Sequence, residues 1–233
     1  MKNKFFTLQT IVPLCILMSM ALTACQKADS SDVNQNKIYA EYELFYDKDA
    51  DKTYASAIFK FNSVTGTQLQ LTPPSEIKFG SDAIPWDPTF AYYRKEYAGQ
   101  INSGTFTFKD SSGVAYSNTV NLAAIITNPV IDTIHKSGSF TYTWVGNSIS
   151  ANEAAGLTIA FTAGPTNFQY FYQNTVGSTN FVLSATKLNL LPNGPSTCTL
   201  ERSCQTTAPS VTSAGGVIRG KYRALNTSVY IAN

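Results

Sequence analysis

The chain has 233 residues, of which 43% are hydrophobic and 14% charged. Lys2 and Lys4 are two of its 17 basic residues, so the rest of the chain carries 15 residues of each sign. Such a balanced chain lacks the concentrated positive charge of nucleic-acid-binding proteins, and we expect no nucleic-acid partner. The length suits one large domain or two small ones.

Residues 1–24 have the layout of a secretory signal. Two lysines precede an apolar run from Ile11 to Leu22, and small residues follow. The run is about 12 residues long, whereas a helix that spans a membrane needs about 20. We therefore expect this segment to be a signal that is removed, rather than a transmembrane anchor.

Cys25 follows directly, in the sequence Leu22-Thr23-Ala24-Cys25. These residues resemble the lipobox of bacterial lipoproteins, in which a signal peptidase cuts before a cysteine that carries a diacylglyceryl thioether. The resemblance covers residues 1–25 only. It implies that Cys25 is an acylated anchor in membrane lipid, which is durable because several acyl chains hold it.

The residue after the cysteine bears on location. It is Gln26, whereas Asp at this position retains lipoproteins of enterobacteria at the inner membrane. The resemblance therefore favours the outer membrane, with the protein facing the periplasm or the cell surface.

Residues 25–36 continue as a polar segment whose one large apolar residue is Val33. Such a segment buries too little apolar surface to order itself. We predict a tether that reaches at most about 36 Å when it is fully stretched.

From Ile38 onward, apolar residues recur at every second position, which is the period of a half-buried strand. In the segment 39–46, for example, Tyr42, Leu44 and Tyr46 share one face. Further short strand patterns follow, separated by turn signals such as Pro73-Pro74. The pattern predicts an all-β fold, an antiparallel β-sandwich.

A proline within residues 126–133 separates two blocks of strands, of which the second is poor in charge. We expect two sandwich domains in tandem, residues 37–128 and 129–233, although one continuous sandwich across Pro129 is the alternative. The segments FTYTW (140–144) and LTIAF (157–161) resemble central strands of an immunoglobulin-like domain, with Trp144 as its buried tryptophan. That likeness implies the fold class alone.

Cys198 and Cys204 are the cysteines left once Cys15 leaves with the leader and Cys25 is acylated. Two cysteines in an oxidising compartment usually bond, so we predict a disulfide between them. Two thiols and a single histidine fall short of the four ligands of a structural zinc site.

Asp47, Asp49 and Asp51 alternate along the chain, a spacing that can gather oxygen ligands around calcium. An EF-hand loop would need Gly and Glu where Lys52 and Ile58 stand. The alternative is a charged turn between two strands. Calcium is the one cofactor that the sequence suggests.

Aromatic residues cluster at 85–97 and 167–174. Exposed aromatic rings can stack on sugar faces, so Trp86, Tyr170 and Tyr172 are candidate ligand-binding residues, with a glycan as the candidate ligand. The alternative is that the rings pack in the core, which is the default for aromatic residues.

The segment GGVIRGKY (215–222) reads as a strand that directs Arg219, Lys221 and Arg223 to one face. Such a row of cations could meet an acidic partner, a lipopolysaccharide phosphate or a lipid headgroup. It could also be a solvated face or a protected sheet edge.

Catalytic motifs are scarce. His135 is the one histidine, and neither a G-x-S-x-G nor an H-E-x-x-H motif occurs. We therefore expect a non-enzymatic lipoprotein that acts as a binding, adhesion or envelope-assembly module, with a glycan or an envelope protein as its partner. The alternative is a carbohydrate-active or other hydrolytic envelope enzyme, whose two carboxylates would meet only in three dimensions.

Overall fold

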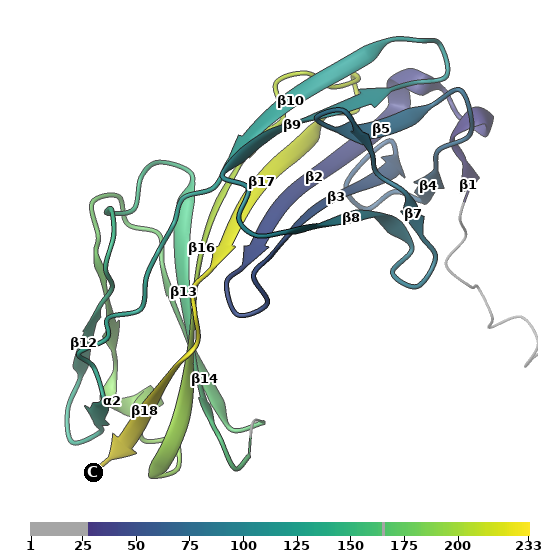
Figure 1. Ribbon diagram of the computed structural model, residues 1–233. Helices are drawn as coiled ribbons and strands as arrows, with labels where there is room; N and C mark the ends of the chain where they lie inside the picture. Colours follow the sequence, from purple (N-terminus) through teal and green to yellow (C-terminus); the bar gives the residue numbers. More distant parts are fainter. Residues whose placement is uncertain (1–27, 165) are drawn as a thin grey trace, which may run out of the picture.

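The structure is a computed structural model that describes residues 28–164 and 166–233 (Figure 1). The predicted leader and Cys25 lie outside these residues. Regular structure is almost entirely strand, so the prediction of an all-β sandwich is confirmed. Within the described residues, no helix combines the length and the apolar character needed to cross a membrane.

One twelve-stranded sheet runs through the length of the molecule. Its main path has the spatial order β1, β4, β3, β2, β17, β16, β13 and β14, and β7, β8, β11 and β18 pair alongside this path. The bounds are β1 Ala28–Asp29, β2 Ile38–Asp47, β3 Lys52–Phe61, β4 Gln68–Gln70, β7 Trp86–Asp87, β8 Tyr92–Ala98, β11 Thr133–His135, β13 Glu153–Phe161, β14 Phe168–Gln173, β16 Gly194–Thr207, β17 Gly216–Arg223 and β18 Thr227–Ala232.

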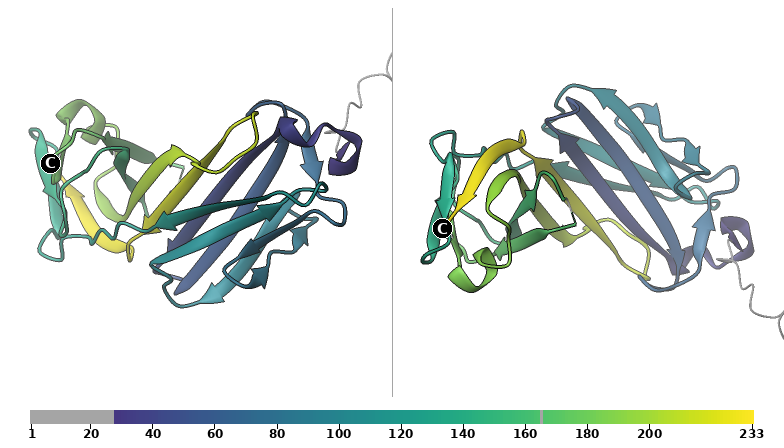
Figure 2. Two further views of the ribbon diagram at one scale, coloured as in Figure 1. Left: turned by 90° about the horizontal axis from the view of Figure 1, so that it is seen from above. Right: turned by 90° about the horizontal axis from the view of Figure 1, so that it is seen from below.

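Two smaller sheets cover one face of this large sheet, one near each end (Figure 1). The four-stranded sheet consists of β5 Glu76–Phe79, β6 Asp82–Ala83, β9 Ser103–Lys109 and β10 Ala115–Asn121. The two-stranded sheet consists of β12 Phe140–Thr143 and β15 Asn180–Leu183, followed by the short helix α2 Ala185–Leu188. Figure 2 shows that the C-terminus and the end that carries β1 lie at opposite ends of an elongated body.

Each covering sheet closes its own hydrophobic core. Beneath the four-stranded sheet, Tyr42 of β2 stacks on Phe106 of β9 with ring centroids 5.3 Å apart. In the other core, Trp144 is 3% exposed and contacts Phe181 at 5.2 Å, so the expected buried tryptophan is present. Large aromatic side chains thus supply much of the apolar burial in both cores.

Strand β17 ties the two ends of the sheet together. It pairs parallel to β2, with Ile218 opposite Tyr42, and antiparallel to β16 on its other side. A Cβ at Gly216 would lie 2.5 Å from the carbonyl oxygen of Ala40, so a residue without a side chain is needed there.

The two cores do not separate at one point of the chain. Ile218, from the C-terminal part, packs in the core under the four-stranded sheet, whereas Tyr46, from the N-terminal part, packs in the other core. The division between residues 128 and 129 stays a prediction. The strands themselves pair across it in one continuous sheet.

The tether prediction for residues 25–36 is wrong from residue 28 onward. Strand β1 pairs with β4, and two short 3-10 turns follow, η2 Ser30–Asp32 and η3 Gln35–Lys37. Ser30 is fully buried, and its hydroxyl accepts a hydrogen bond from Thr72 N at 2.9 Å. The segment orders because its polar groups bond to the folded body, a gain that its own composition does not reveal.

The predicted disulfide is also wrong, because both cysteines are free. They lie on one strand, β16, with Cys198 opposite Ile159 and Cys204 opposite Glu153. Six residues of extended strand separate their Cα atoms by about 20 Å, whereas a disulfide needs roughly 4.4–6.8 Å. No turn in β16 brings them together.

Candidate binding face

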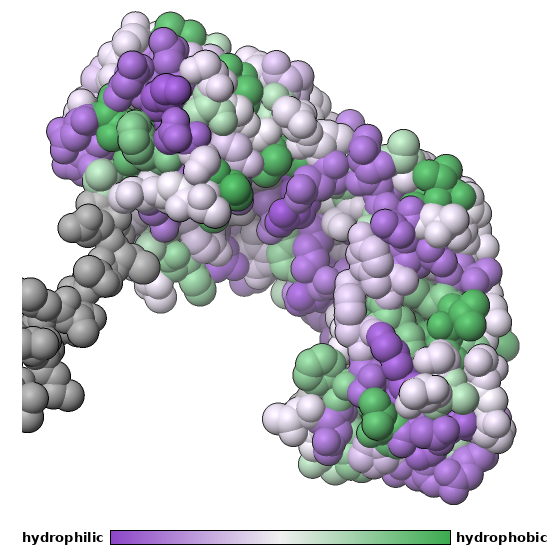
Figure 3. Space-filling view, turned by 180° about the vertical axis from the view of Figure 1, so that it is seen from behind, coloured by the Kyte–Doolittle hydropathy of each residue, from purple (hydrophilic) through white to green (hydrophobic). Residues whose placement is uncertain are grey.

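The face of the large sheet opposite the two covering sheets carries no further layer in the described chain. In Figure 1 the covering strands β9, β10 and β12 lie on the convex side of the bent molecule, so the uncovered face is concave. Figure 3 shows the resulting hollow, lined mainly by hydrophilic residues. We call the outward side chains of seven neighbouring strands, β8, β3, β2, β17, β16, β13 and β14, the concave face.

The predicted cation row lies at the centre of this face. Because β17 pairs in register with β2, Arg219 lies opposite Glu43, and Arg223 lies opposite Asp47. Each guanidinium Nη1 donates to the facing carboxylate at 3.0 Å. The row is therefore neutralised by an acidic strand beside it.

Strand β16 neutralises the row from its other side. Glu201 accepts from Lys221 Nζ at 2.9 Å and from Arg223 Nε at 2.8 Å. On the far side of β2 from β17, Lys60 Nζ of β3 donates to Glu41 of β2 at 2.6 Å. The centre of the concave face thus carries four cations matched to four carboxylates.

Aromatic rings fill the gaps between these ion pairs. Phe45 and Tyr54 stack at 5.8 Å between ring centroids. The charged ends of Lys221 and Arg223 each lie 5.1 Å from the centroid of Phe45. Arg94 lies 4.2 Å from that of Tyr54. Stacked cations of this kind restrain the side chains of the face.

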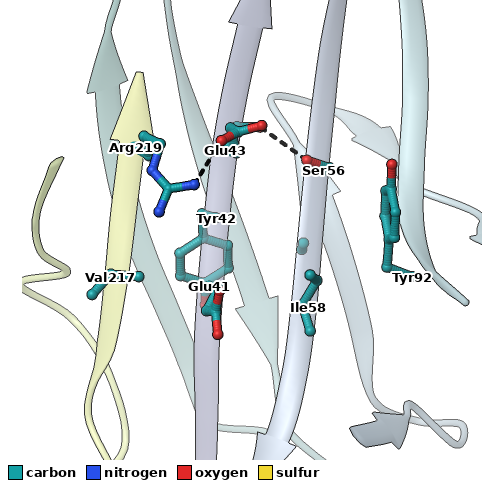
Figure 4. A pocket seen from close by; sticks show the side chains of 9 residues that line it. Glu41, Tyr42, Glu43, Ser56, Ile58, Tyr92, Val217 and Arg219 are labelled. Carbon is teal, nitrogen blue, oxygen red and sulfur yellow. Dashed lines mark hydrogen bonds and ion pairs between the residues drawn. The ribbon is translucent and has the colours of Figure 1, made fainter. Parts of the chain in front are cut away.

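A first pocket of about 200 Å³ opens on this face (Figure 4). Glu43 and Arg219 face each other on one side, and Tyr92 projects from β8 on the other. The hydroxyl of Ser56 donates to the carbonyl oxygen of Glu43 at 3.5 Å. The remaining lining residues are Glu41, Tyr42, Ala57, Ile58 and Val217.

A second pocket of about 350 Å³ lies on the other side of Arg219. Arg219 Nε donates to Gln205 Oε1 at 2.9 Å, and both residues line this pocket. The other lining residues are Asn152, Glu153, Ala154, Tyr172, Asn174 and Ser203. Since Arg219 is common to both pockets, they adjoin across the middle of the concave face.

Two of the three predicted ligand-binding residues lie together on β14. Tyr170 and Tyr172 are 48% and 58% exposed and point to the concave face, whereas Phe171 between them is buried. Tyr172 lines the second pocket. Their role in binding stays a prediction.

The hydroxyl end of the Tyr170 ring lies against a glycine. A Cβ at Gly156 of β13 would lie 2.6 Å from Tyr170 Oη and 2.9 Å from Cε2, so the absence of a side chain there gives the ring its place. Partial burial raises the pKa of Tyr170, with smaller contributions from Glu201 and Tyr172. The glycine thus shapes the aromatic end of the face.

The third predicted ligand-binding residue, Trp86, lies elsewhere. It begins β7 and packs against Tyr93 at the rim of the first core, with ring centroids 5.1 Å apart. The structure therefore does not bring Trp86 together with the tyrosines of β14. Tyr92 of β8, rather than Trp86, is the aromatic residue that lines the first pocket near this end of the concave face.

The structure does not form the predicted calcium site. Asp47 binds Arg223, Asp49 Oδ1 accepts from Asn226 N at 3.0 Å, and Asp51 Oδ1 accepts from Tyr46 Oη at 2.9 Å. Across residues 28–164 and 166–233 no three acidic, histidine or cysteine side chains gather where they could hold a metal. Each carboxylate has a different partner, on β17, on the loop between β17 and β18, and on β2 respectively.

Sequence reasoning missed Arg202, the buried cation behind the second pocket. Its Nη1 donates to Asn147 O at 2.8 Å and its Nη2 donates to Ser148 O at 2.7 Å. Nη2 also pairs with Glu153 Oε2 at 2.5 Å. The sequence did contain a signal for the burial of Arg202, because Cys198, Leu200 and Arg202 alternate on the inward face of one strand.

The carboxylate pair that hydrolysis would require has a candidate in the first pocket, where Glu41 and Glu43 both lie. Each is held in an ion pair, with Lys60 and Arg219 respectively. Both carboxylates are therefore bound to cations of the face rather than free to contact a substrate. The pocket is also smaller than the roughly 300–1,000 Å³ of typical enclosed ligand sites.

Comparisons with known proteins give no family. No family model matches the chain, and no curated protein matches it. Among solved structures, it is similar to the FN1–FN3 domains of chicken CNTN1 (10% identity, TM-score 0.28), covering 83% of this chain and 66% of that one. It is also similar to a structure of a 1.5-MDa bacterial ice-binding adhesin (11% identity, TM-score 0.26, covering 84% and 65%).

A third similar structure is that of the two tandem V-type regions of VCBP3, a v-region-containing chitin binding protein. Identity is 10% and the TM-score 0.20, with 80% of this chain and 98% of that one covered. The chain spans just under two thirds of the first two structures. With TM-scores at this level, none of the three carries an argument about function.

Proposed function

We propose that this chain is an extracytoplasmic lipoprotein, anchored through Cys25, whose sandwich acts as a binding or adhesion module through its concave face. The observation that carries the proposal is the concave face itself. One uncovered sheet face extends over both cores, and two adjoining pockets meet at Arg219 on it. A small-molecule site usually encloses most of its ligand, whereas an uncovered sheet face leaves one side of a ligand open, so the face suits an extended partner.

The anchor has a geometric consequence. Only residues 26 and 27 separate Cys25 from Ala28, where β1 pairs with the large sheet. An anchored chain would therefore hold the β1 end of the body directly at the membrane, and the end with the C-terminus would project away from it (Figure 2). The proposed location is the outer membrane.

Anchoring is tested by metabolic labelling with radioactive palmitate. The wild-type chain should incorporate label, and Cys25→Ser should not. Equal labelling of both would contradict the anchor. Separation of inner and outer membranes of the labelled cells then tests the location.

Binding is tested with the whole chain purified in detergent, so that the outcome does not depend on its N-terminal modification. The probes are immobilised peptidoglycan, lipopolysaccharide, outer-membrane vesicles and a panel of polysaccharides. The wild-type chain should bind at least one probe, and the double variant R219A/Y172A should bind it less. If the wild-type chain binds none of them, the binding function is wrong.

A further inference from the structure

We infer that the ligand of the concave face is an extended, uncharged polysaccharide that crosses the sheet from Tyr92 to Tyr172 over Arg219. This inference rests on the proposed function, because it names the ligand class of the same face. Four properties of the described residues support it: the charge balance, the donors and acceptors in the pockets, the aromatic rings at the two ends, and the state of the neighbouring sheet edge.

At the centre of the concave face the charge balance disfavours an anionic ligand, whereas Arg94 at the β8 end stacks on Tyr54 and Phe90 and belongs to none of the ion pairs of the described residues. Lys60, Arg219, Lys221 and Arg223 each have a carboxylate within 3.0 Å. A phosphate, sulfate or carboxylate on the ligand would have to compete with these carboxylates, and each would repel it. A cationic ligand would meet the same obstacle from the paired cations. An uncharged ligand meets neither.

The pockets supply the hydrogen-bonding groups that sugar hydroxyls require. A hydroxyl both donates and accepts, and so do the amides of Asn152, Asn174 and Gln205 and the hydroxyl of Ser203 in the second pocket. Arg219, with its side chain 40% exposed, presents donors between the two pockets. The ion pair with Glu43 and the hydrogen bond to Gln205 hold that guanidinium in one orientation.

An aromatic ring lies at each end of this polar strip. Tyr92 bounds the first pocket and Tyr172 the second. Tyrosine offers an apolar ring face and a polar tip, which suits the apolar faces and hydroxyl edges of pyranose rings. Tyr170, whose ring end lies against Gly156, continues the aromatic end beside Tyr172.

The spacing of these rings requires an extended ligand. From β8 to β14 the concave face crosses six gaps between neighbouring strands. At about 4.8 Å per gap this is about 29 Å along the sheet. A monosaccharide cannot reach both ends, whereas a polysaccharide segment can.

An added β-strand from a protein partner fits this region less well. The edge that such a strand would use is β14, and Lys187 Nζ already donates to the carbonyl oxygen of Tyr170 there at 2.8 Å. Lys187 belongs to helix α2, and covering a strand edge with a helix is a common device against edge-to-edge pairing. The side-chain face, rather than the strand edge, therefore offers the binding surface.

Affinity electrophoresis of the detergent-purified chain tests the inference. The gels contain uncharged polysaccharides (β-glucan, mannan, galactomannan, xylan) or anionic ones (alginate, heparin, lipopolysaccharide). We expect retardation by at least one uncharged polymer and by no anionic polymer at 150 mM salt. Y172A and R219A should each weaken the retardation about tenfold. Y230A is the matched control, because Tyr230 is 50% exposed but lines neither pocket.

The outcomes separate the inference from the proposed function. Binding to an anionic polymer or to an envelope protein, lost in R219A, would leave the concave face as a binding surface and overturn the uncharged-glycan ligand. Uncharged-glycan binding that persists in both Y172A and R219A would overturn the placement on this face. Failure to bind any uncharged polymer overturns the inference. Circular dichroism and thermal melts of each variant show that it is folded.

Discussion

Arg202 and Glu153 form an ion pair beneath the second pocket, with 2.5 Å between Nη2 and Oε2. The side chain of Arg202 is 2% exposed and that of Glu153 11%. Glu153 also accepts from Ser150 N at 2.7 Å, while Arg202 holds the carbonyl oxygens of Asn147 and Ser148. The pair thus links the loop before β13 to β16. It also supports one side of the second pocket, which Glu153 lines.

Truncation of this pair should be costly. Arg202→Ala removes the partner of a nearly buried carboxylate and three hydrogen bonds, so we expect the free energy of unfolding to fall by about 3–5 kcal/mol. Urea denaturation measures it. K221A is the control, since the Lys221 pair is partly exposed and should contribute less than about 1 kcal/mol. A loss of under 1 kcal/mol in R202A would contradict the structural role.

Gly156→Ala should displace the ring of Tyr170, because the new Cβ would lie 2.6 Å from Oη. Partial burial raises the pKa of Tyr170, so its phenolate fraction at pH 8 is small. A displaced ring is better solvated, its pKa falls, and nitration by tetranitromethane should accelerate at Tyr170. Peptide mass spectrometry measures it.

The matched control for that substitution is Gly138→Ala, whose Cβ would meet nothing within 4 Å. It should leave the nitration rate of Tyr170 unchanged. Equal rates in wild type and G156A would show that the glycine does not determine the ring position.

The two free thiols should differ in reactivity with pH. Burial raises the pKa of Cys198 to about 12, and burial followed by the charge of Glu153 raises that of Cys204. Because the thiolate is the reactive form, Cys198 and Cys204 of the native chain should react slowly with Ellman's reagent at pH 8. Labelling of Cys204 should rise as the pH approaches 10, while Cys198 reacts only after denaturation. An intramolecular disulfide in the non-reduced peptide map would contradict the structure.

The local features of this fold could be predicted from the sequence, and the long-range ones could not. The alternation in residues 39–46 predicted the right strand and the right buried face, because a two-residue period is a local signal. The pairing of β17 with β2 joins residues 176 positions apart, as in the contact of Arg219 with Glu43. Nothing local in either strand specifies that partner.

The same distinction explains the errors. The segment between Cys198 and Cys204 contains no Gly, Pro, Asn or Asp, so reading it as a strand would have placed the two thiols too far apart to bond. Residues 28–36 were predicted to be a tether from their composition, but they order through contacts with Thr72 and Ser111. Of the candidate site, Tyr170 and Tyr172 could be proposed from aromatic clustering, whereas the two pockets around Arg219 exist only once β14, β16 and β2 are assembled.

The ordered segment after Ala28 can be tested through Gln35. Its Nε2 donates to Ser30 O at 2.7 Å and Val33 O at 3.0 Å, and its Oε1 accepts from Ser111 N at 3.2 Å. Gln35→Ala should lower the free energy of unfolding by about 1–3 kcal/mol and speed amide hydrogen exchange over residues 28–37. N36A is the control, since the side chain of Asn36 is exposed. Random-coil exchange of this segment in wild type would show that it is a tether after all.

Glu201 should determine the charge selectivity of the concave face. It neutralises both Lys221 and Arg223, so Glu201→Gln leaves a net positive charge at the centre of the face. The variant should gain affinity for heparin or alginate, and this affinity should fall steeply between 50 and 500 mM salt, because screening and counterion release both oppose it. Glu76→Gln removes one carboxylate from the partly exposed pair with Lys78 on the covering sheet, so it is the matched control and should show no gain. Affinity electrophoresis over a salt series measures both. If E201Q gains no more affinity than E76Q, the exclusion of anions does not come from the ion pairs of the concave face, and the charge argument for an uncharged ligand is lost with it.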